Sequence, residues 1–206
     1  MAHRPKYKLS FTAASLRLNE MVKVAKAANE MGIPDLKMLK DSGVVFGSVK
    51  SRTSEREFRE IQKRLEEFTP EQMNVLINGD LISQKQIAFL AVCKHYDFIR
   101  DFTIEVLRDK TLVFDYTINE SDFNSFIDRR VNDHPELETF SDSTLKKAKQ
   151  VMFLILEQCG IINNATDKVI LPQIVQPDVV RAVVKEDPIW LKIFLISDMD
   201  IKQLKY

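Results

Sequence analysis

The fold of this chain is decided between Asn119 and Gly160, where the sequence reads NESDFNSFIDRRVNDHPELETFSDSTLKKAKQVMFLILEQCG. The spacing of its apolar residues predicts a helix over 120–131, a short helix over 136–140 and a long helix over 142–159. A polar segment that contains proline separates the first two helices, and proline disfavours helical backbone in the residue before it.

The ends of the long helix are marked by residues suited to those places. Ser141 stands at its start, where a hydroxyl oxygen accepts a hydrogen bond from a free backbone N–H group. Gly160 stands just past its end, where glycine readily adopts a left-handed conformation. The last two turns are apolar almost all round, and the first two turns carry three cations, Lys146, Lys147 and Lys149. A helix anchored in a core at one end and cationic at the other is typical of the recognition helix in helix-turn-helix proteins.

The composition indicates a helical globular protein. Of 206 residues, 45% are apolar, and only five are glycine and seven proline, which favours long helices over tightly turned sheets. We therefore predict an all-α fold with at most a short extended or wing-like segment. No secretory leader and no membrane-spanning run is visible. Cys93 and Cys159 lie in apolar helical runs, which favours reduced core thiols and a cytoplasmic location.

Charge is unevenly distributed along the chain, although the net charge is zero. Residues 1–68 hold 14 Lys/Arg and 9 Asp/Glu, a net charge of +5, so residues 69–206 carry −5. This asymmetry is consistent with a basic face in the first third of the chain or with ordinary variation of surface charge. A boundary near 110–119 predicts two helical domains, 1–110 and 111–206.

Further helices follow from apolar spacing, capping residues and proline positions. After an extended lead-in over 7–12, we predict a helix over 13–31, a short helix after Pro34, a loop over 41–49, a helix capped by Ser54, a helix that begins at the Thr69-Pro70 step, and a tract over 84–110 capped by Ser83 and broken near 95–97. The chain then continues with an extended segment over 168–175 and short helices over 177–184 and 188–196.

The sequence offers little sign of catalysis. It contains no phosphate-binding glycine loop, no dinucleotide-binding glycine turn and no nucleophile elbow. The three histidines lack partners at the spacing of metal ligands. Cys93 and His95 are two residues apart, which places them on different faces of a helix, so both are interpreted as structural. We predict a protein that is not an enzyme and that needs no metal and no cofactor.

Two basic clusters remain as candidates for binding. The first follows the predicted loop, where a helix start combines hydroxyls, cations and free N–H groups suited to a phosphate. The second is the start of the long helix, together with two arginines that end the helix before it. The candidate DNA-binding residues are Arg52, Ser54, Arg56, Arg59, Lys63, Arg129, Arg130, Thr144, Lys146, Lys147, Lys149 and Gln150.

Two other interpretations stay open on the residues alone. Helices rich in Glu and Lys are common, so both clusters could be ordinary solvated helix faces. The chain could instead be a subunit that docks other proteins through its acidic C-terminal region. In that case Trp190 would be exposed beside Phe194, because exposed aromatic residues mark partner sites.

The order of features also resembles a known family. The matching segments are Tyr7-Lys8-Leu9-Ser10-Phe11-Thr12, Leu16-x-Leu18-Asn19-Glu20, Arg52-Thr53-Ser54 before Arg64-Leu65, Gln86-Ile87-Ala88-Phe89-Leu90-Ala91-Val92-Cys93-Lys94, Asp101-Phe102-x-x-Glu105-Val106-Leu107-Arg108, His134-Pro135-Glu136-Leu137, Ser143-Thr144-Leu145-Lys146-Lys147 and Cys159-Gly160-Ile161-Ile162. In this order they resemble the BrxA family of BREX (bacteriophage exclusion) phage-defence systems.

The resemblance implies a small, all-helical accessory protein without enzymatic activity that carries two helix-turn-helix-like units and binds DNA. Those units correspond to the two basic clusters. Neither has the short glycine-containing turn usual in a helix-turn-helix. The expected partners are double-stranded DNA and other subunits of a BREX-like complex, with no membrane, and the chain itself is expected to be a monomer.

Overall fold

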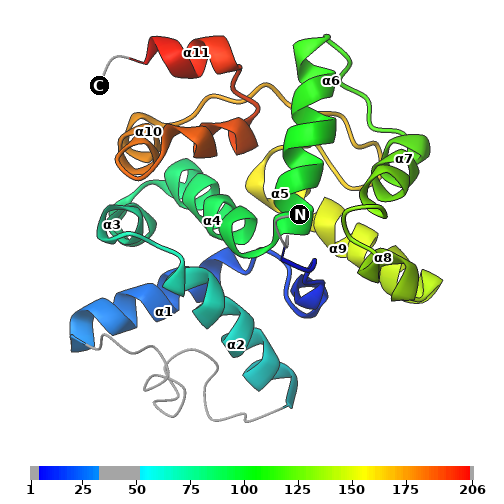
Figure 1. Ribbon diagram of the computed structural model, residues 1–206. Coiled ribbons are helices and arrows are strands. Elements are labelled where there is room, and N and C mark those ends of the chain that lie inside the picture. Colours follow the sequence, from blue (N-terminus) through cyan, green and yellow to red (C-terminus); the bar gives the residue numbers. More distant parts are fainter. Residues whose placement is uncertain (1–4, 33–51, 205–206) are drawn as a thin grey trace.

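The computed structural model describes residues 5–32 and 52–204, without the side chains of Thr53 and Ser54. The helices in these ranges are η1 (Ser10–Ala13), α1 (Leu18–Met31), α2 (Arg52–Glu66), α3 (Pro70–Asn78), α4 (Leu81–His95), α5 (Asp97–Phe102), η3 (Thr103–Arg108), α6 (Asp109–Leu112), α7 (Glu120–Arg130), α8 (Glu136–Thr139), α9 (Asp142–Cys159), α10 (Pro177–Val184), η4 (Pro188–Phe194) and α11 (Asp198–Gln203) (Figure 1). The predicted all-α fold is confirmed.

Helix α4 lies at the centre of the molecule, and most other helices pack around it (Figure 1). Its residues 86–93 are all buried, so α4 is covered on every side. A helix that is apolar all round belongs in the middle of a core. Around it, α1, α2 and α3 lie on one side, α7 and α9 on another, and α10 and η4 on a third.

The helix ends predicted for the 119–160 segment are nearly those observed. In α9 the Ser141 hydroxyl accepts a hydrogen bond from the Thr144 N–H at 3.3 Å. Gly160 follows with a φ of 83°, which is the left-handed conformation expected there. Helix α3 begins at Pro70, as predicted, with a capping box between Thr69 and Gln72. The predicted break near 95–97 is also present, at Tyr96 between α4 and α5.

Several predicted helix starts are wrong. The helix predicted over 13–31 begins only at Leu18, because residues 10–13 form a separate 3-10 turn and Arg17 takes a left-handed φ of 53°. Ser54 is not a cap, since α2 is already helical from Arg52. Ser83 does not cap α4 either. Asp80 does, by accepting a hydrogen bond from the Ser83 N–H at 2.7 Å.

The Ser83 hydroxyl serves a different purpose, because it donates to the Asp178 carboxylate at 2.9 Å and links α4 to α10. The tract predicted over 84–110 continues after its break through η3, a π-helical segment that apolar spacing does not reveal. The short helix predicted after Pro34 and the loop predicted over 41–49 lie outside the described residues.

Three short extended segments pair with one another, and one of them lies in the predicted wing. Thr117 pairs antiparallel with Val169, and Ile162 pairs antiparallel with Ile170. Four hydrogen bonds hold these segments together, with Ile118 N donating to Lys168 O at 3.1 Å, Ile170 N to Tyr116 O at 2.7 Å, Asn163 N to Val169 O at 3.0 Å and Leu171 N to Ile161 O at 2.9 Å. The chain order is therefore an extended segment, then α7, α8 and α9, and then a narrow hairpin.

Candidate nucleic-acid interface

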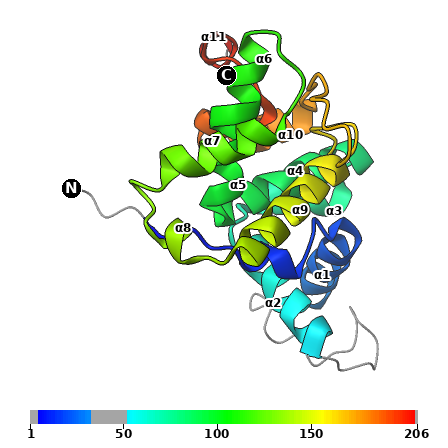
Figure 2. The same cartoon turned by 90° about the vertical axis from the view of Figure 1, so that its right-hand side faces the viewer.

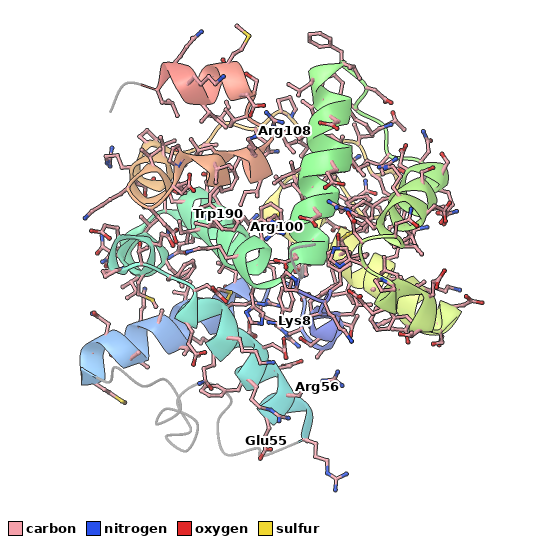
Figure 3. The ribbon with its side chains drawn as sticks, in the orientation of Figure 1. Lys8, Glu55, Arg56, Arg100, Arg108 and Trp190 are labelled. Atoms are coloured by element: carbon pink, nitrogen blue, oxygen red, sulfur yellow. The ribbon has the colours of Figure 1, made fainter. Side chains whose placement is uncertain are left out.

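Helix α2 carries four cations along one face. Arg52, Arg56, Arg59 and Lys63 are spaced by four, three and four residues, which places them on one side of a helix. The three arginines are exposed. Figure 3 shows Arg56 projecting from α2 at the lower edge of the molecule, away from the core. We call these four residues the α2 stripe.

The opposite face of α2 fixes the direction of the stripe. Phe58, Ile61 and Leu65 are buried in the common core, so the helix cannot rotate about its axis without exposing them. Within the stripe, Lys63 forms an ion pair with Glu60 at 3.0 Å, while its side chain stays 44% exposed. Ser54 belongs to the same helix, but its side chain is outside the described residues.

The start of α9 forms the second predicted cluster. Lys146, Lys147 and Gln150 are exposed, while Ala148 and Met152 on the opposite face are buried. The Thr144 hydroxyl lies 2.9 Å from the Ser141 hydroxyl, so it contributes to the cap of the helix. In Figure 2, α2 lies at the lower end of the molecule and α9 lies above it.

Lys149 differs from its neighbours because it lies within a groove between α7 and α9. Its ammonium is 5.1 Å from the centre of the Phe123 ring and forms an ion pair with Glu120. Burial lowers the pKa of the Lys149 ammonium, and the nearby charge of Lys168 lowers this pKa further. The ion pair with Glu120 favours the charged ammonium and so acts to raise this pKa. Glu120 is 70% exposed, however, so water screens its charge.

The groove has a volume of about 890 Å³. Apolar side chains form much of its wall, and both cations and carboxylates line it. The lining residues are Glu120, Phe123, Asn124, Ile127, Asp128, Asp142, Leu145, Lys146, Lys149, Gln150, Phe153, Leu154, Ala165 and Lys168. Sequence reasoning missed Lys168, which lies 5.4 Å from the centre of the Phe153 ring. Its only signal in the sequence is its place in the predicted wing.

The two arginines at the end of α7 have different surroundings. Arg129 is exposed. Arg130 is largely buried and forms ion pairs with Asp101 at 3.3 Å and with Glu105. It therefore links α7 to the α5–η3 tract, and its guanidinium is not available to a phosphate without breaking these pairs.

The cysteines and the histidine considered next, which could in principle serve catalysis or metal binding, belong to the core. Cys93 and Cys159 are buried free thiols, and burial raises the pKa of each. His134 is buried and stacks on Tyr7 with ring centres 3.6 Å apart. Within 5–32 and 52–204, no group of three or more His, Cys, Asp and Glu residues could hold a metal ion.

The surface predicted around Trp190 is not an exposed aromatic pair. Phe194 is completely buried, and Trp190 is partly buried and packs against the core. In the described part of the chain, no helix is long and apolar enough to span a membrane.

Comparisons of this chain with family models and with curated proteins point to the same family. The BrxA family model matches residues 5–187. The curated "BREX protein BrxA" of Escherichia coli O9:H4 (strain HS) is 25% identical over 112 residues, which are 54% of this chain and 53% of that protein. The protein of the same name from Bacillus cereus (strain H3081.97) is 28% identical over 87 residues, 42% of this chain and 44% of that protein. The matches therefore span about half the length of these curated relatives.

A solved structure shows the same fold. The crystal structure of an uncharacterized protein from Magnetospirillum magneticum superimposes with a TM-score of 0.79 and covers 93% of this chain and 98% of that protein. The sequence identity is 21%, so this likeness concerns the fold alone.

Proposed function

The chain belongs to the BrxA family, and we propose that it is a non-enzymatic DNA-binding accessory protein of a BREX phage-defence system. It would bind duplex DNA mainly through phosphate contacts from two basic helix-turn-helix-like units, one around α2 and one around α9. Other subunits of the same defence system are its second proposed class of partner.

The α2 stripe is the observation that carries this proposal. From residue 52 to residue 63 a helix rises by about 16 Å. Duplex DNA presents one phosphate per 1.7 Å of axis, so about nine phosphates lie along that length. Because apolar residues on the opposite face fix the helix, the three arginines face solvent together, and Lys63 stays 44% exposed beside Glu60. Pre-positioned cations lose less side-chain entropy on binding than mobile ones.

The α9 unit supports the proposal through its topology. An extended segment, α7, α8, α9 and a hairpin follow one another, and the exposed cations lie at the start of α9. A hairpin beside a recognition helix provides a second contact to the DNA backbone. We propose Lys146, Lys147 and Arg129 as phosphate contacts here and Gln150 as the residue nearest to base edges. Arg130 and Lys149 are left out because each is ion-paired within the fold and its side chain is only 13% or 16% exposed, respectively.

A duplex of random sequence tests the proposal directly. Fluorescence anisotropy of the labelled duplex, measured over a range of salt concentrations, gives both affinity and the number of phosphate contacts. Each contact contributes about −0.9 to the slope of log K against log salt. We expect binding with little dependence on sequence and a slope that indicates several contacts. Absence of binding at low salt would contradict the proposal.

Replacing Arg56 and Arg59 together by alanine is expected to reduce the magnitude of that slope by about 1.8, or two contacts. At 0.1 M salt this corresponds to a loss of affinity of roughly 60-fold, since the counterion term varies as salt to the power −1.8. Both side chains are exposed, so the fold should be unaffected. The matched control replaces Arg181 and Lys202, two exposed cations on α10 and α11, by alanine. Equal losses in both double variants would show that net charge, and not the α2 stripe, determines binding.

The second unit is tested separately by replacing Lys146 and Lys147 by alanine. We expect the magnitude of the slope to fall by about one to two, with the same loss on every DNA sequence. Full retention of affinity and slope in this folded variant would remove α9 from the interface and leave α2 as the binding surface.

A further inference from the structure

A short non-helical segment, residues 5–9, precedes η1, and we call it the N-terminal strap. Its side chains alternate between the core and solvent. Tyr7 is buried and Leu9 packs against the core, whereas Lys6 and Lys8 are exposed. Side chains two residues apart share a face of a non-helical, strand-like segment, so both ammonium groups lie on the outer face of the strap.

Tyr7 anchors the middle of the strap. Its N–H group donates to Glu136 of α8 at 2.6 Å, and its hydroxyl donates to Asp101 of α5 at 2.8 Å. Its ring stacks on His134, with ring centres 3.6 Å apart. The backbone on either side of Tyr7 is therefore fixed, and a cation on a fixed backbone loses less entropy on binding than one on a mobile chain.

The strap lies between the two basic units. Tyr7 contacts α8, which immediately precedes α9 in the chain. Three residues later, the Ser10 hydroxyl donates at 3.0 Å to Glu60 of α2. The same carboxylate pairs at 3.0 Å with Lys63, the last cation of the α2 stripe. Three residues span at most about 10 Å, so the strap is close to the α9 unit at one end and to the α2 stripe at the other.

The packing of the neighbouring helices agrees with this position. Helix η1, which continues from the strap, packs against both α2 and α9. In Figure 2 the strap, in dark blue, lies beside α8 and above α2. In the view of Figure 3, Lys8 lies between Arg100 on α5 and Arg56 on α2.

The carboxylates that contact the strap or η1 are already bonded. Three such carboxylates are largely buried, and each has a partner within the fold: Glu60 with Lys63, Asp101 with Arg100 and Arg130, and Glu136 with His134. In contrast, among the residues that the structure describes, neither Lys6 nor Lys8 has an ion-pair partner. Both ammonium groups can therefore bind a phosphate without breaking a pair within the fold.

We infer that Lys6 and Lys8 are phosphate contacts, and that the strap and the α2 stripe bind one and the same duplex. Two residues of an extended segment span about 6.6 Å, over which one DNA strand presents about two phosphates. The strap extends the α2 stripe toward the α9 unit. This inference rests on the proposed DNA binding and adds to it two contacts that the basic helices do not supply.

Replacing Lys6 and Lys8 together by alanine is expected to reduce the magnitude of the salt slope by about 1.8, and affinity at 0.1 M salt by roughly 60-fold. Both side chains are exposed and Tyr7 is retained, so the melting temperature should be unchanged. Fluorescence anisotropy with the random-sequence duplex measures the affinity, and the Arg181/Lys202 double variant is again the matched control. An unchanged slope in the Lys6/Lys8 variant, or an equal loss in the control, would overturn the inference.

A quadruple variant tests whether the strap and the α2 stripe act on one duplex. Contacts made at the same time to one duplex contribute additively to the slope, so replacing Lys6, Lys8, Arg56 and Arg59 by alanine should lower its magnitude by about 3.6. A reduction no larger than that of either double variant would mean that the strap and the stripe do not hold one duplex together.

Amine acetylation of the wild-type protein, measured by mass spectrometry with and without the duplex, distinguishes direct contact from a long-range effect of charge. Lys6 and Lys8 should react more slowly when the duplex is bound, while the exposed Lys202 on α11 should react at the same rate. If the wild type binds DNA through the α2 stripe but Lys6 and Lys8 stay unprotected, this inference fails and the proposed function stands. If the wild type does not bind the duplex at low salt, both fail.

Discussion

Replacement of Arg64 by alanine is expected to lower the free energy of unfolding by about 3–5 kcal/mol. Arg64 is completely buried and donates hydrogen bonds to the carbonyl oxygens of Ala14, Ser15 and Leu16, at 2.6, 2.6 and 3.1 Å. These carbonyls belong to the extended segment between η1 and α1. A buried carbonyl left without a partner costs about 1–3 kcal/mol, so loss of one side chain affects three groups at once.

The surroundings of Arg64 make compensation difficult. Its guanidinium lies 5.4 Å from the centre of the Tyr96 ring, and the Tyr96 hydroxyl donates a hydrogen bond to Glu60. Burial raises the pKa of Tyr96 to about 12, so this hydroxyl stays protonated at neutral pH. Urea unfolding followed by circular dichroism measures the loss of stability. The control is Arg59→Ala in the same helix, where the exposed side chain should change stability by no more than about 0.5 kcal/mol. Similar values for both variants would contradict the structural role of Arg64.

The contacts of Arg64 are of a kind that local sequence patterns do not predict. Local signals such as capping residues and apolar spacing predict α9, α3 and α10 nearly to the residue, because those signals act within a few residues of each other. The contacts of Arg64 join residues about 50 positions apart. One sign is available in retrospect, since Arg64 follows Ile61 by three residues and therefore lies on the apolar face of α2.

The same difference between local signals and long-range contacts decides which parts of the candidate interface can be predicted from the sequence. Exposure of Arg56, Arg59 and Lys147 follows from helix periodicity alone, since each lies off the apolar face of its helix. Periodicity does not reveal that Arg130 would be drawn to Asp101 and Glu105 on a different helix. Periodicity also does not reveal that Leu112, Val113 and Phe114 are exposed at the end of α6.

Replacement of Phe102 by alanine is expected to lower the free energy of unfolding by about 3–5 kcal/mol, through lost apolar burial and the cavity that remains. Phe102 is completely buried in α5. Its ring centre lies 6.0 Å from that of Phe123, 5.3 Å from that of Phe126 and 5.9 Å from that of Phe153. Each favourable aromatic pair adds about 0.5–1.5 kcal/mol beyond burial, which places the expected loss toward the upper end of that range.

This cluster joins residues on both sides of the boundary predicted near 110–119, so the Phe102 variant also tests that division. Trp190 in η4 reports on the C-terminal part by fluorescence, while circular dichroism reports on all helices. If the cluster couples the two parts, both signals will shift together to lower urea concentration in a single transition. Phe102→Leu retains most of the volume and should cost less than Phe102→Ala, because the cavity is smaller although the aromatic pairs are lost. Two separated transitions in Phe102→Ala would instead mean that residues 1–110 and 111–206 unfold as independent units, and that the aromatic cluster holds together two domains that are each stable alone.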